Sequence, residues 1–289
     1  MESRITGKTV LTGLIGSPVE HSISPMMHNE AFRILNLNYV YLAFDVNLPR
    51  LEKAVEGLRC LGVRGFNVTM PDKNQICGMM DELSPEARIG GAVNTVLNHD
   101  GKLKGFTTDG KGFATAVETD GVNIAGSKMT ILGAGGAGTS ILIQSALDGA
   151  SEINIFNSKS SFYYRTKNII DQLKNETKCR IHLFDYSDEK KFEKEIRDSS
   201  ILVNATPVGM APETEKCLIK NDSVFHPELY VFDAIYEPRQ TMLLKKAEKC
   251  GCRTANGLNM LLYQGAEAFK IWTGKDMPVD LIKNKIFNK

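Results

Sequence analysis

The first hundred residues alternate short apolar runs of β-forming residues with segments whose apolar positions recur at helical spacing. The β-type runs read TVLTGLIG, YVYLAFDV and GFNVTM, and helical spacing appears over residues 24–35 and in LPRLEKAVEGLRCLG. Ser24 and Pro25 suit an N-cap and a first helical position. The expected core residues of this helix are Met27, Phe32 and Leu35. The alternation predicts an α/β domain with a parallel sheet covered by helices.

Residues 92–108 contain two further β-type runs, AVNTVLN and KLKGFTT, on either side of Asp100 and Gly101. An Asp-Gly pair between two such runs is a strong signal for a tight hairpin. We expect this hairpin at the edge of the first sheet.

A second series of strands and helices begins with a predicted helix near residues 111–118. The expected strands are MTILG, EINIFN, RIHLF, SILVNAT, YVFDAIY and RTANG, with helical segments between most of them, and Gly251 ends the helix TMLLKKAEKCG. This order predicts a Rossmann-type, doubly wound parallel sheet. The last amphipathic pattern, LNMLLYQGAEAFKIW, is expected to return to the first domain. The chain is therefore predicted to have two α/β domains, formed by residues 1–110 with 258–289 and by residues 111–257.

Composition narrows the classes of function. The 289 residues carry 35 Lys and Arg against 34 Asp and Glu without a basic run, which argues against a nucleic-acid surface. The N-terminus MESRITGKTV lacks the apolar core of a signal peptide, so a cytoplasmic protein is expected. Residues 129–147 are uncharged, but their glycines and polar side chains favour a strand, a turn and a helix over a membrane span.

The six cysteines and five histidines follow no metal-binding or disulfide pattern. Only Cys250 and Cys252 lie close together, and no H-E-x-x-H motif or i, i+4 histidine pair occurs. Reduced thiols and the absence of a metal site are expected.

The segment ILGAGGAG contains G-x-G-x-x-G between a predicted strand and a predicted helix. Glycines let the turn tighten and the backbone approach a pyrophosphate, while the helix N-terminus supplies N–H groups and a partial positive charge. A turn without a ligand is the less favoured alternative, because four glycines in six residues weaken a fold that gains nothing from them. The predicted dinucleotide-binding loop consists of Gly133, Ala134, Gly135, Gly136, Ala137 and Gly138.

The second strand of such a domain normally ends in an Asp or Glu that binds the adenosine ribose of NAD. Here EINIF is followed by Asn157, Ser158 and Lys159. With no carboxylate to repel a 2′-phosphate and one lysine able to pair with it, the sequence favours NADP and leaves NAD as the alternative.

Polar residues at strand ends of the first domain become candidates once chemistry is expected near a nicotinamide. Each has an ordinary structural explanation by itself: Lys73 as a solvated lysine, Ser24 as a helix cap, Asp109 as a turn residue. The full set is Ser22, Ser24, Asn67, Thr69, Lys73, Asn94 and Asp109.

Eight motifs follow one another along the chain: SISPMMHNEAF, GFNVTMPDK, GAVNTV, TTDGKGF, ILGAGGAG, NATPVGM, DAIYEPRQT and MLLYQGA. Together they resemble shikimate dehydrogenases, in particular the quinate/shikimate dehydrogenase branch, over essentially the whole chain. The resemblance implies the reversible NADPH-linked reduction of 3-dehydroshikimate to shikimate in aromatic amino acid biosynthesis, with NADH as cofactor in some members.

The resemblance also implies roles for individual residues. Lys73 and Asp109 would form the catalytic pair. The implied substrate contacts are Ser22, Ser24, Thr69, Asn94, Tyr236 and Gln264, with the two serines binding the carboxylate. The implied cofactor contacts outside the glycine loop are Asn157, Ser158, Lys159, Thr206, Ile235 and Gly257.

Elementary chemistry supports this catalytic pair. Hydride addition to a ketone places developing negative charge on oxygen, and a lysine ammonium within hydrogen-bond reach stabilises that charge and delivers the proton. Asp109 is suited to hold the ammonium in position and to bind a ring hydroxyl. Short polar side chains also suit a polyhydroxylated ring.

The chain departs from the family pattern near Asp109 and in the cofactor loop. The usual N-T-D-G reads TTDG over residues 107–110. The usual arginine after the strand-end asparagine is Ser158, which removes a cation that would clamp a 2′-phosphate. The acid of NAD-tolerant relatives is also missing, since Ser160 and Ser161 stand there.

Three functions compete at this point. The first is a shikimate dehydrogenase that uses NADP or NAD. The second is a quinate dehydrogenase with the same residues, for which the contacts near Ser22, Ser24 and Tyr236 decide, because quinate carries an extra hydroxyl. The third is a non-catalytic module that senses a dinucleotide or a shikimate-like ligand, against which Lys73 and Asp109 argue. Both a monomer and a homodimer fit the sequence.

Overall fold

The computed structural model describes residues 5–70 and 73–287, and the chain divides into two compact units. Unit 1 contains the chain up to Thr108 and from Leu262 onward, and unit 2 contains Asp109–Leu261. The chain thus passes between the units at the start of one helix, α4 (Asp109–Thr119), and within another, α9 (Leu258–Thr273).

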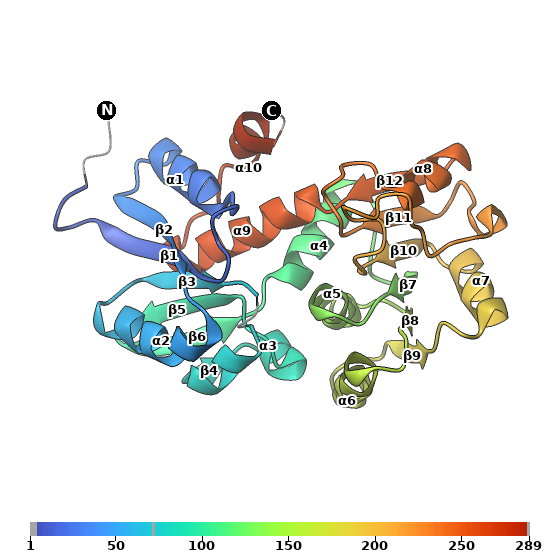
Figure 1. Cartoon of the computed structure of the whole chain (residues 1–289), viewed down its shortest axis with the longest axis horizontal. Helices are drawn as coiled ribbons and strands as arrows, with labels where there is room; N and C mark the ends of the chain where they lie inside the picture. Colours follow the sequence, from blue (N-terminus) through green and yellow to red (C-terminus); the bar gives the residue numbers. More distant parts are fainter. Residues whose placement is uncertain (1–4, 71–72, 288–289) are drawn as a thin grey trace. The chain divides into compact units, whose positions relative to one another are not determined.

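Unit 1 is built on a six-stranded sheet in the order β2-β1-β3-β5-β6-β4 (Figure 1). Its strands are β1 (Val10–Gly16), β2 (Tyr39–Asp45), β3 (Gly65–Val68), β4 (Glu82–Leu83), β5 (Thr95–His99) and β6 (Lys102–Phe106). Its helices, besides the larger part of α9, are α1 (Ser24–Ile34), α2 (Leu51–Cys60), α3 (Pro85–Gly90) and α10 (Val279–Ile282). β1, β2 and β3 are parallel, whereas β5 runs antiparallel to both β3 and β6, so the sheet is mixed.

The predicted hairpin is present as β5 and β6. Asp100 and Gly101 close it with φ values of 51° and 84°, the left-handed conformations that a two-residue Asp-Gly turn requires. Its predicted position is wrong, because the short strand β4 pairs with β6 and covers the outer side of the hairpin.

Helices cover both faces of this sheet. Phe66 of β3 packs in a cluster with Val55 and Leu58 of α2. The preceding residue, Gly65, lies against Trp272 of α9, where an added Cβ would come within 2.2 Å of the indole nitrogen. Since successive strand residues point to opposite faces, α2 and α9 pack on opposite sides of the sheet.

Unit 2 contains a wholly parallel sheet in the order β12-β11-β10-β7-β8-β9. Its strands are β7 (Lys128–Leu132), β8 (Glu152–Phe156), β9 (Arg180–Phe184), β10 (Ile201–Asn204), β11 (Tyr230–Asp233) and β12 (Arg253–Asn256). Besides α4 its helices are α5 (Gly136–Leu147), α6 (Ser161–Glu176), α7 (Glu189–Arg197) and α8 (Met242–Lys249). This strand order is the doubly wound order of Rossmann-type domains, so the predicted fold class is confirmed.

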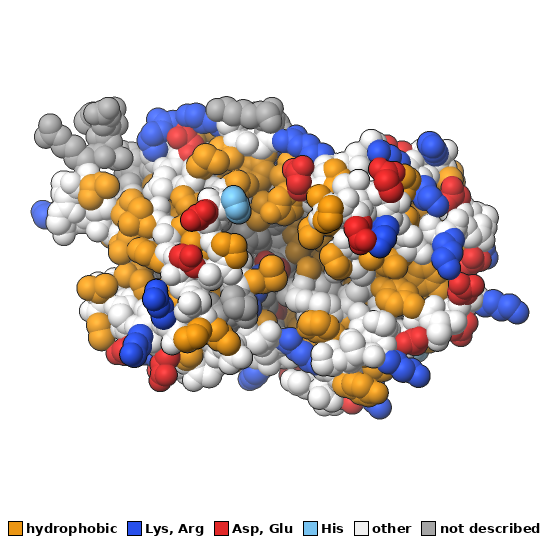
Figure 2. Space-filling view, in the orientation of Figure 1, with side chains coloured by type: hydrophobic (Ala, Val, Ile, Leu, Met, Phe, Trp, Pro, Cys, Tyr) orange, Lys and Arg blue, Asp and Glu red, His pale blue; other side chains and the backbone are white. Residues whose placement is uncertain are grey.

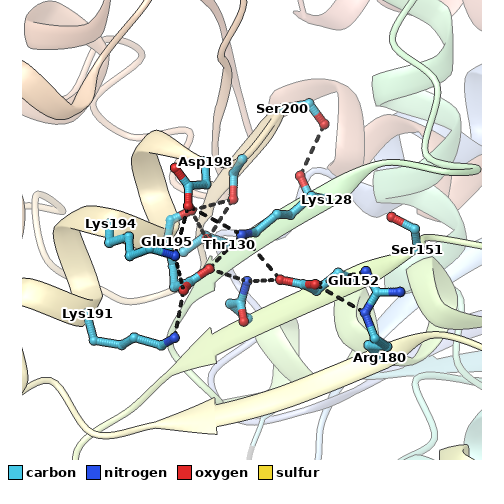
Figure 3. Close-up of polar contacts among 12 residues, drawn as sticks. Lys128, Thr130, Ser151, Glu152, Arg180, Lys191, Lys194, Glu195, Asp198 and Ser200 are labelled. Atoms are coloured by element: carbon cyan, nitrogen blue, oxygen red, sulfur yellow. Dashed lines mark hydrogen bonds and ion pairs between the residues drawn. The ribbon is translucent and has the colours of Figure 1, made fainter.

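A network of charged side chains joins the amino ends of β7 and β8 to α7 (Figure 3). The Glu195 side chain is only 4% exposed and pairs with Lys128 at 2.7 Å and with Lys191 at 2.8 Å. Asn154 Nδ2 donates to the same carboxylate at 3.1 Å. Because the strands are parallel, this network lies at the edge of the sheet opposite to the glycine loop and serves the fold.

Figure 2 shows Lys and Arg side chains interspersed with Asp and Glu side chains on the visible face of each unit. Within residues 5–70 and 73–287, no helix is both long and apolar enough to cross a membrane, and no three His, Cys, Asp or Glu side chains gather as metal ligands. All six cysteines are free.

Candidate functional site

The glycine loop connects β7 to α5 at the carboxyl edge of the unit 2 sheet. Gly133 has a φ of +97°, and a Cβ there would lie 2.7 Å from Thr206 Cγ2. At Gly138 a Cβ would lie 1.9 Å from the Gly133 carbonyl oxygen, so this glycine lets α5 pack on the loop. Gly135 and Gly136 have open space where a Cβ would stand. Two glycines thus shape the loop and two leave its outer side open, which suits close approach of a pyrophosphate.

The first turn of α5 completes this anion site. Gly135 is the N-cap residue, no side chain caps the helix, and the first turn holds no acidic residue. Backbone N–H groups at such an end point toward the loop and add a partial positive charge. The twelve-residue helix can therefore bind a phosphate at its N-terminus.

Asn157 ties the glycine loop to the segment after β8. Ala134 N donates to Asn157 Oδ1 at 3.0 Å, and the Asn157 amide donates to the Ser158 carbonyl oxygen and the Ser160 hydroxyl. Ser158 and Lys159 are exposed. The residues predicted to bind adenosine thus lie directly beside the glycine loop.

A carboxylate reaches this segment from another strand. Asp185, which follows β9, accepts a hydrogen bond from Lys159 N at 3.2 Å. The prediction of a loop without a carboxylate is therefore wrong, because it considered only the residues that follow β8. Asp185 directly after the apolar strand RIHLF was the available sequence signal.

A polar network joins the other predicted cofactor residues at the ends of β10 and β11. Thr206 Oγ1 donates to Asn204 Oδ1 at 2.7 Å, and Asn204 Nδ2 donates to Asp233 Oδ1 at 3.0 Å. Asp233 also accepts from Ile235 N, whose carbonyl oxygen accepts from Gly257 N. Burial raises the pKa of Asp233. Asn204 and Asp233 were missed from the sequence, although each is a polar residue that ends an apolar strand.

In unit 1 the two serines of S-x-S are neighbours. Ser24 N donates to Ser22 Oγ at 3.2 Å. The interpretation of Ser24 as an N-cap is wrong, because α1 begins at Ser24 and Ile23 occupies the N-cap position without a side-chain cap. The Ser24 side chain instead lies near the hydroxyl of Tyr41 on β2.

Tyr41 connects Ser24 to the neighbouring strands. Its buried hydroxyl donates to Asn67 Oδ1 at 2.8 Å. Asn67 Nδ2 donates to the Asn94 carbonyl oxygen at 3.1 Å and to Thr95 Oγ1 at 3.0 Å. Tyr41 was not predicted as a site residue, because an apolar strand with several aromatic residues gave no signal for one polar hydroxyl.

Thr108 extends this series to α9. Thr108 N donates to Asn94 Oδ1 at 2.9 Å, and Asn94 Nδ2 donates to Thr108 Oγ1 at 3.1 Å. Thr108 Oγ1 in turn donates to Gln264 Oε1 at 3.5 Å. Two predicted substrate residues, Asn94 and Gln264, are thus members of one hydrogen-bonded series, and Ser24 lies near its Tyr41 end.

Lys73 and Thr69 come from the segment after β3, in which Pro71 and Asp72 lie outside the described residues. The Lys73 carbonyl oxygen accepts from Val93 N at 2.8 Å, which holds the lysine main chain beside the residue that precedes Asn94. Thr69 is half-buried, and its N–H donates to the Ile15 carbonyl oxygen at the end of β1. Both residues therefore lie at the edge of the sheet that carries Asn94.

The remaining predicted residues belong to unit 2. Asp109 is the half-buried first residue of α4, and Tyr236 is 46% exposed after β11. A polar cavity of about 410 Å³ also lies beside β12 and α8, lined among others by Arg239, Glu248 and Asn256. None of the predicted site residues lines this cavity, so it offers no alternative location for the same chemistry.

Two family models match the chain. The shikimate dehydrogenase substrate binding domain matches residues 14–96, and the shikimate 5′-dehydrogenase C-terminal domain matches residues 257–287. Curated relatives align over almost the whole length. The shikimate dehydrogenase (NADP(+)) of Listeria monocytogenes is 51% identical over 98% of both chains, and that of Streptococcus uberis is 49% identical over 100% of this chain and 99% of its own.

Solved structures are similar over the same length. Shikimate 5-dehydrogenase from Listeria monocytogenes, in complex with shikimate and NAD, has a TM-score of 0.95 at 51% identity and covers 98% of both chains. A shikimate dehydrogenase in complex with NADP+ has a TM-score of 0.87 at 39% identity, over 99% of this chain and 97% of its own. Quinate dehydrogenase from Corynebacterium glutamicum, in complex with NAD, has a TM-score of 0.86 at 27% identity, over 97% and 99%.

Proposed function

We infer that this chain, which belongs to the shikimate dehydrogenase family, catalyses the reversible oxidation of shikimate to 3-dehydroshikimate with NADP or NAD as the hydride acceptor. The full-length relatives at about half identity support this reaction. The observation on the chain itself that carries it is the hydrogen-bonded series from Tyr41, which lies near Ser24, through Asn94 to Gln264. This series presents short polar side chains suited to a carboxylated, polyhydroxylated ring.

Unit 1 would bind the substrate through its strand-end residues. The Ser24 N–H donates to the Ser22 hydroxyl, so the two serines lie side by side, and a pair of hydroxyl donors suits the two oxygens of a carboxylate. The contacts to ring hydroxyls are proposed to come from Thr69, Asn94 and Gln264, with Tyr236 beside the bound ring. The hydrogen bonds of Asn94 and Gln264 hold these two side chains in place before substrate arrives, which reduces the cost of ordering them on binding.

Lys73 is proposed to move the proton. When bound, the nicotinamide cofactor supplies or accepts the hydride at the ring carbon that bears the reacting oxygen. In the reductive direction the Lys73 ammonium donates its proton to the oxygen as negative charge develops there. In the oxidative direction the neutral amine takes the hydroxyl proton, and Asp109 orients the lysine and binds a ring hydroxyl.

Unit 2 would hold the cofactor. The open side of the glycine loop and the uncapped N-terminus of α5 suit its pyrophosphate. Adenosine is proposed to lie against Asn157, Ser158 and Lys159, whose segment is tied to the loop by Asn157. Thr206, Ile235 and Gly257 are proposed to line the path toward the nicotinamide.

Quinate is a second candidate substrate, supported by the similarity to a quinate dehydrogenase of known structure. Initial rates with shikimate or quinate, each with NADP or NAD, decide between them when each kcat/KM is resolved. Shikimate is expected to be the better substrate. If the kcat/KM for quinate equals or exceeds that for shikimate, quinate replaces shikimate as the proposed substrate. A cytoplasmic location and a monomer or homodimer stay predictions.

Lys73→Ala tests the catalytic role. We expect kcat to fall by about 10² to 10⁴, because positioned proton transfer is lost, while cofactor binding persists. Lys53→Ala, an exposed lysine of α2 in the same unit, is the matched control and is expected to keep full activity. Unchanged turnover in the Lys73 variant would remove the lysine from the mechanism. Cofactor binding without any turnover by the wild-type protein would instead favour a sensing module.

A further inference from the structure

Asp185 holds the loop that is proposed to bind the adenosine end of the cofactor. Its two carboxylate oxygens accept hydrogen bonds from backbone N–H groups, Oδ1 from Ser187 at 2.9 Å and Oδ2 from Lys159 at 3.2 Å. The hydrogen bonds of Ser187, together with the Lys159 N–H and the Lys159 charge, lower the pKa of this carboxyl. Asp185 is therefore ionised at neutral pH and stays beside Lys159.

The neighbouring residue, Tyr186, places the same segment against the glycine loop. Its ring packs against Phe156 and Phe192, with centroids 6.3 and 5.8 Å away. Its buried hydroxyl lacks a well-formed hydrogen bond among the described residues and lies near the backbone of Gly133. Residues 185–186 thus contact both parts of the proposed cofactor site, the glycine loop and the segment after β8.

The charge of Asp185 acts differently on the two cofactors. A 2′-phosphate adds about two negative charges, which the carboxylate repels, whereas a ribose 2′-hydroxyl is neutral and can donate a hydrogen bond to it. The Lys159 N–H that could bind a phosphate oxygen is already used by Asp185. The charge of the Lys159 ammonium, the expected partner of a 2′-phosphate, also interacts with this carboxylate.

We propose that Asp185 is a specificity-determining residue of the cofactor site, which weakens the use of NADP relative to NAD. The proposal rests on the proposed function for the location of adenosine. In this proposal the acid that NAD-binding domains place after β8 is supplied instead by the residue that follows β9.

Asp185→Asn is the test, because it removes the charge and keeps an oxygen acceptor. The ratio of kcat/KM for NADP to kcat/KM for NAD is expected to rise about tenfold, the size of one charge interaction near a surface. The rise should shrink at high salt. Asp171→Asn removes the same charge from an exposed ion pair with Lys174 on α6 and should leave the ratio unchanged.

Calorimetric binding of 2′,5′-ADP and 5′-AMP gives a second readout that needs no turnover. The variant is expected to bind 2′,5′-ADP about tenfold more tightly and 5′-AMP no more tightly than the wild-type protein. If the wild-type protein turns over neither cofactor but this shift appears, the proposed function fails and the role of Asp185 stands. The proposal is overturned if Asp185→Asn keeps its melting temperature while two quantities change by less than twofold. These are the ratio of kcat/KM for NADP to that for NAD, and the affinity for 2′,5′-ADP relative to 5′-AMP. Equal losses of kcat/KM with NADP and with NAD would also overturn the proposal, since they indicate a purely structural role for Asp185.

Discussion

The hydroxyl of Tyr41 donates a hydrogen bond to Asn67 Oδ1 at 2.8 Å in a part of unit 1 that solvent does not reach. The Ser24 side chain lies near the same hydroxyl. Because Asn67 Nδ2 donates to Asn94 and Thr95, the orientation of this amide is fixed from both ends. A strand residue outside the predicted site therefore connects two residues proposed to bind substrate.

Tyr41→Phe should weaken substrate binding more than turnover. The variant leaves Asn67 Oδ1 without its donor, a cost of about 1 to 3 kcal/mol for a buried group, and removes the hydroxyl beside Ser24. We expect KM for shikimate to rise about three- to tenfold, with kcat within about twofold of the wild-type value. Tyr39→Phe on the same strand is the control. If KM stays the same, Tyr41 does not position Ser24.

His28 should make folding stability depend on pH. Its ring is fully buried among aromatic residues, stacks on Tyr41 at 4.5 Å, and has no hydrogen bond from either nitrogen within the described residues. Burial lowers its pKa to about 3, below the 6.5 of an exposed histidine. As the pH falls below about 6.5 the unfolded chain binds the proton first, so this contribution to stability is complete above 6.5 and is lost toward the folded pKa.

His28→Phe removes this proton linkage. Relative to the wild-type protein, the free energy of unfolding of the variant should improve by about 2 kcal/mol between pH 8 and pH 5, whatever the packing change costs at pH 8. Urea unfolding of both proteins at the two pH values measures it. The same difference at both pH values would show that the pKa of His28 is the same in the folded and the unfolded protein.

Glu195 should contribute to stability and not to catalysis. Burial alone would raise its pKa, but hydrogen bonds from Lys128 and Lys191 outweigh this and hold the pKa below its usual value. Glu195→Gln leaves these lysines without their anion, and we expect a loss of about 2 kcal/mol in the free energy of unfolding. Lys174→Met breaks an exposed pair with Asp171 instead and should cost less than about 0.5 kcal/mol. Equal losses would mean that the Glu195 network is solvated like a surface pair.

Two glycine substitutions should separate folding from cofactor binding. Gly138→Ala places a Cβ 1.9 Å from the Gly133 carbonyl oxygen and should lower the melting temperature by several degrees. Gly135→Ala meets no protein atom within 4 Å and should keep the melting temperature. It should nevertheless weaken NAD(P) binding at least tenfold, because the methyl group stands where the pyrophosphate approaches. If Gly135→Ala binds the cofactor as tightly as the wild-type protein, the pyrophosphate does not bind at this loop.

Local sequence patterns were sufficient to predict most helices and strands and the fold class. Strand and helix periodicity, the Asp100-Gly101 turn and the glycine loop depend on residues that are adjacent in the chain, so their physical causes can be read along it. The resemblance of eight ordered motifs then indicated the family, which the full-length relatives confirm. The same resemblance also indicated Lys73 and Asp109, the residues proposed for catalysis.

Only the tertiary structure decided which side chains meet. Asp185 lies beside Lys159, Tyr41 beside Asn67 and Thr108 beside Gln264, pairs that are 26, 26 and 156 residues apart in the chain. It also decided that Ser24 lies near Tyr41 and does not cap α1, and that β4 covers the hairpin. The physical reason is that a hydrogen bond forms with whichever group lies within about 3 Å after the strands have taken their order, and periodicity along the chain carries no information about that order.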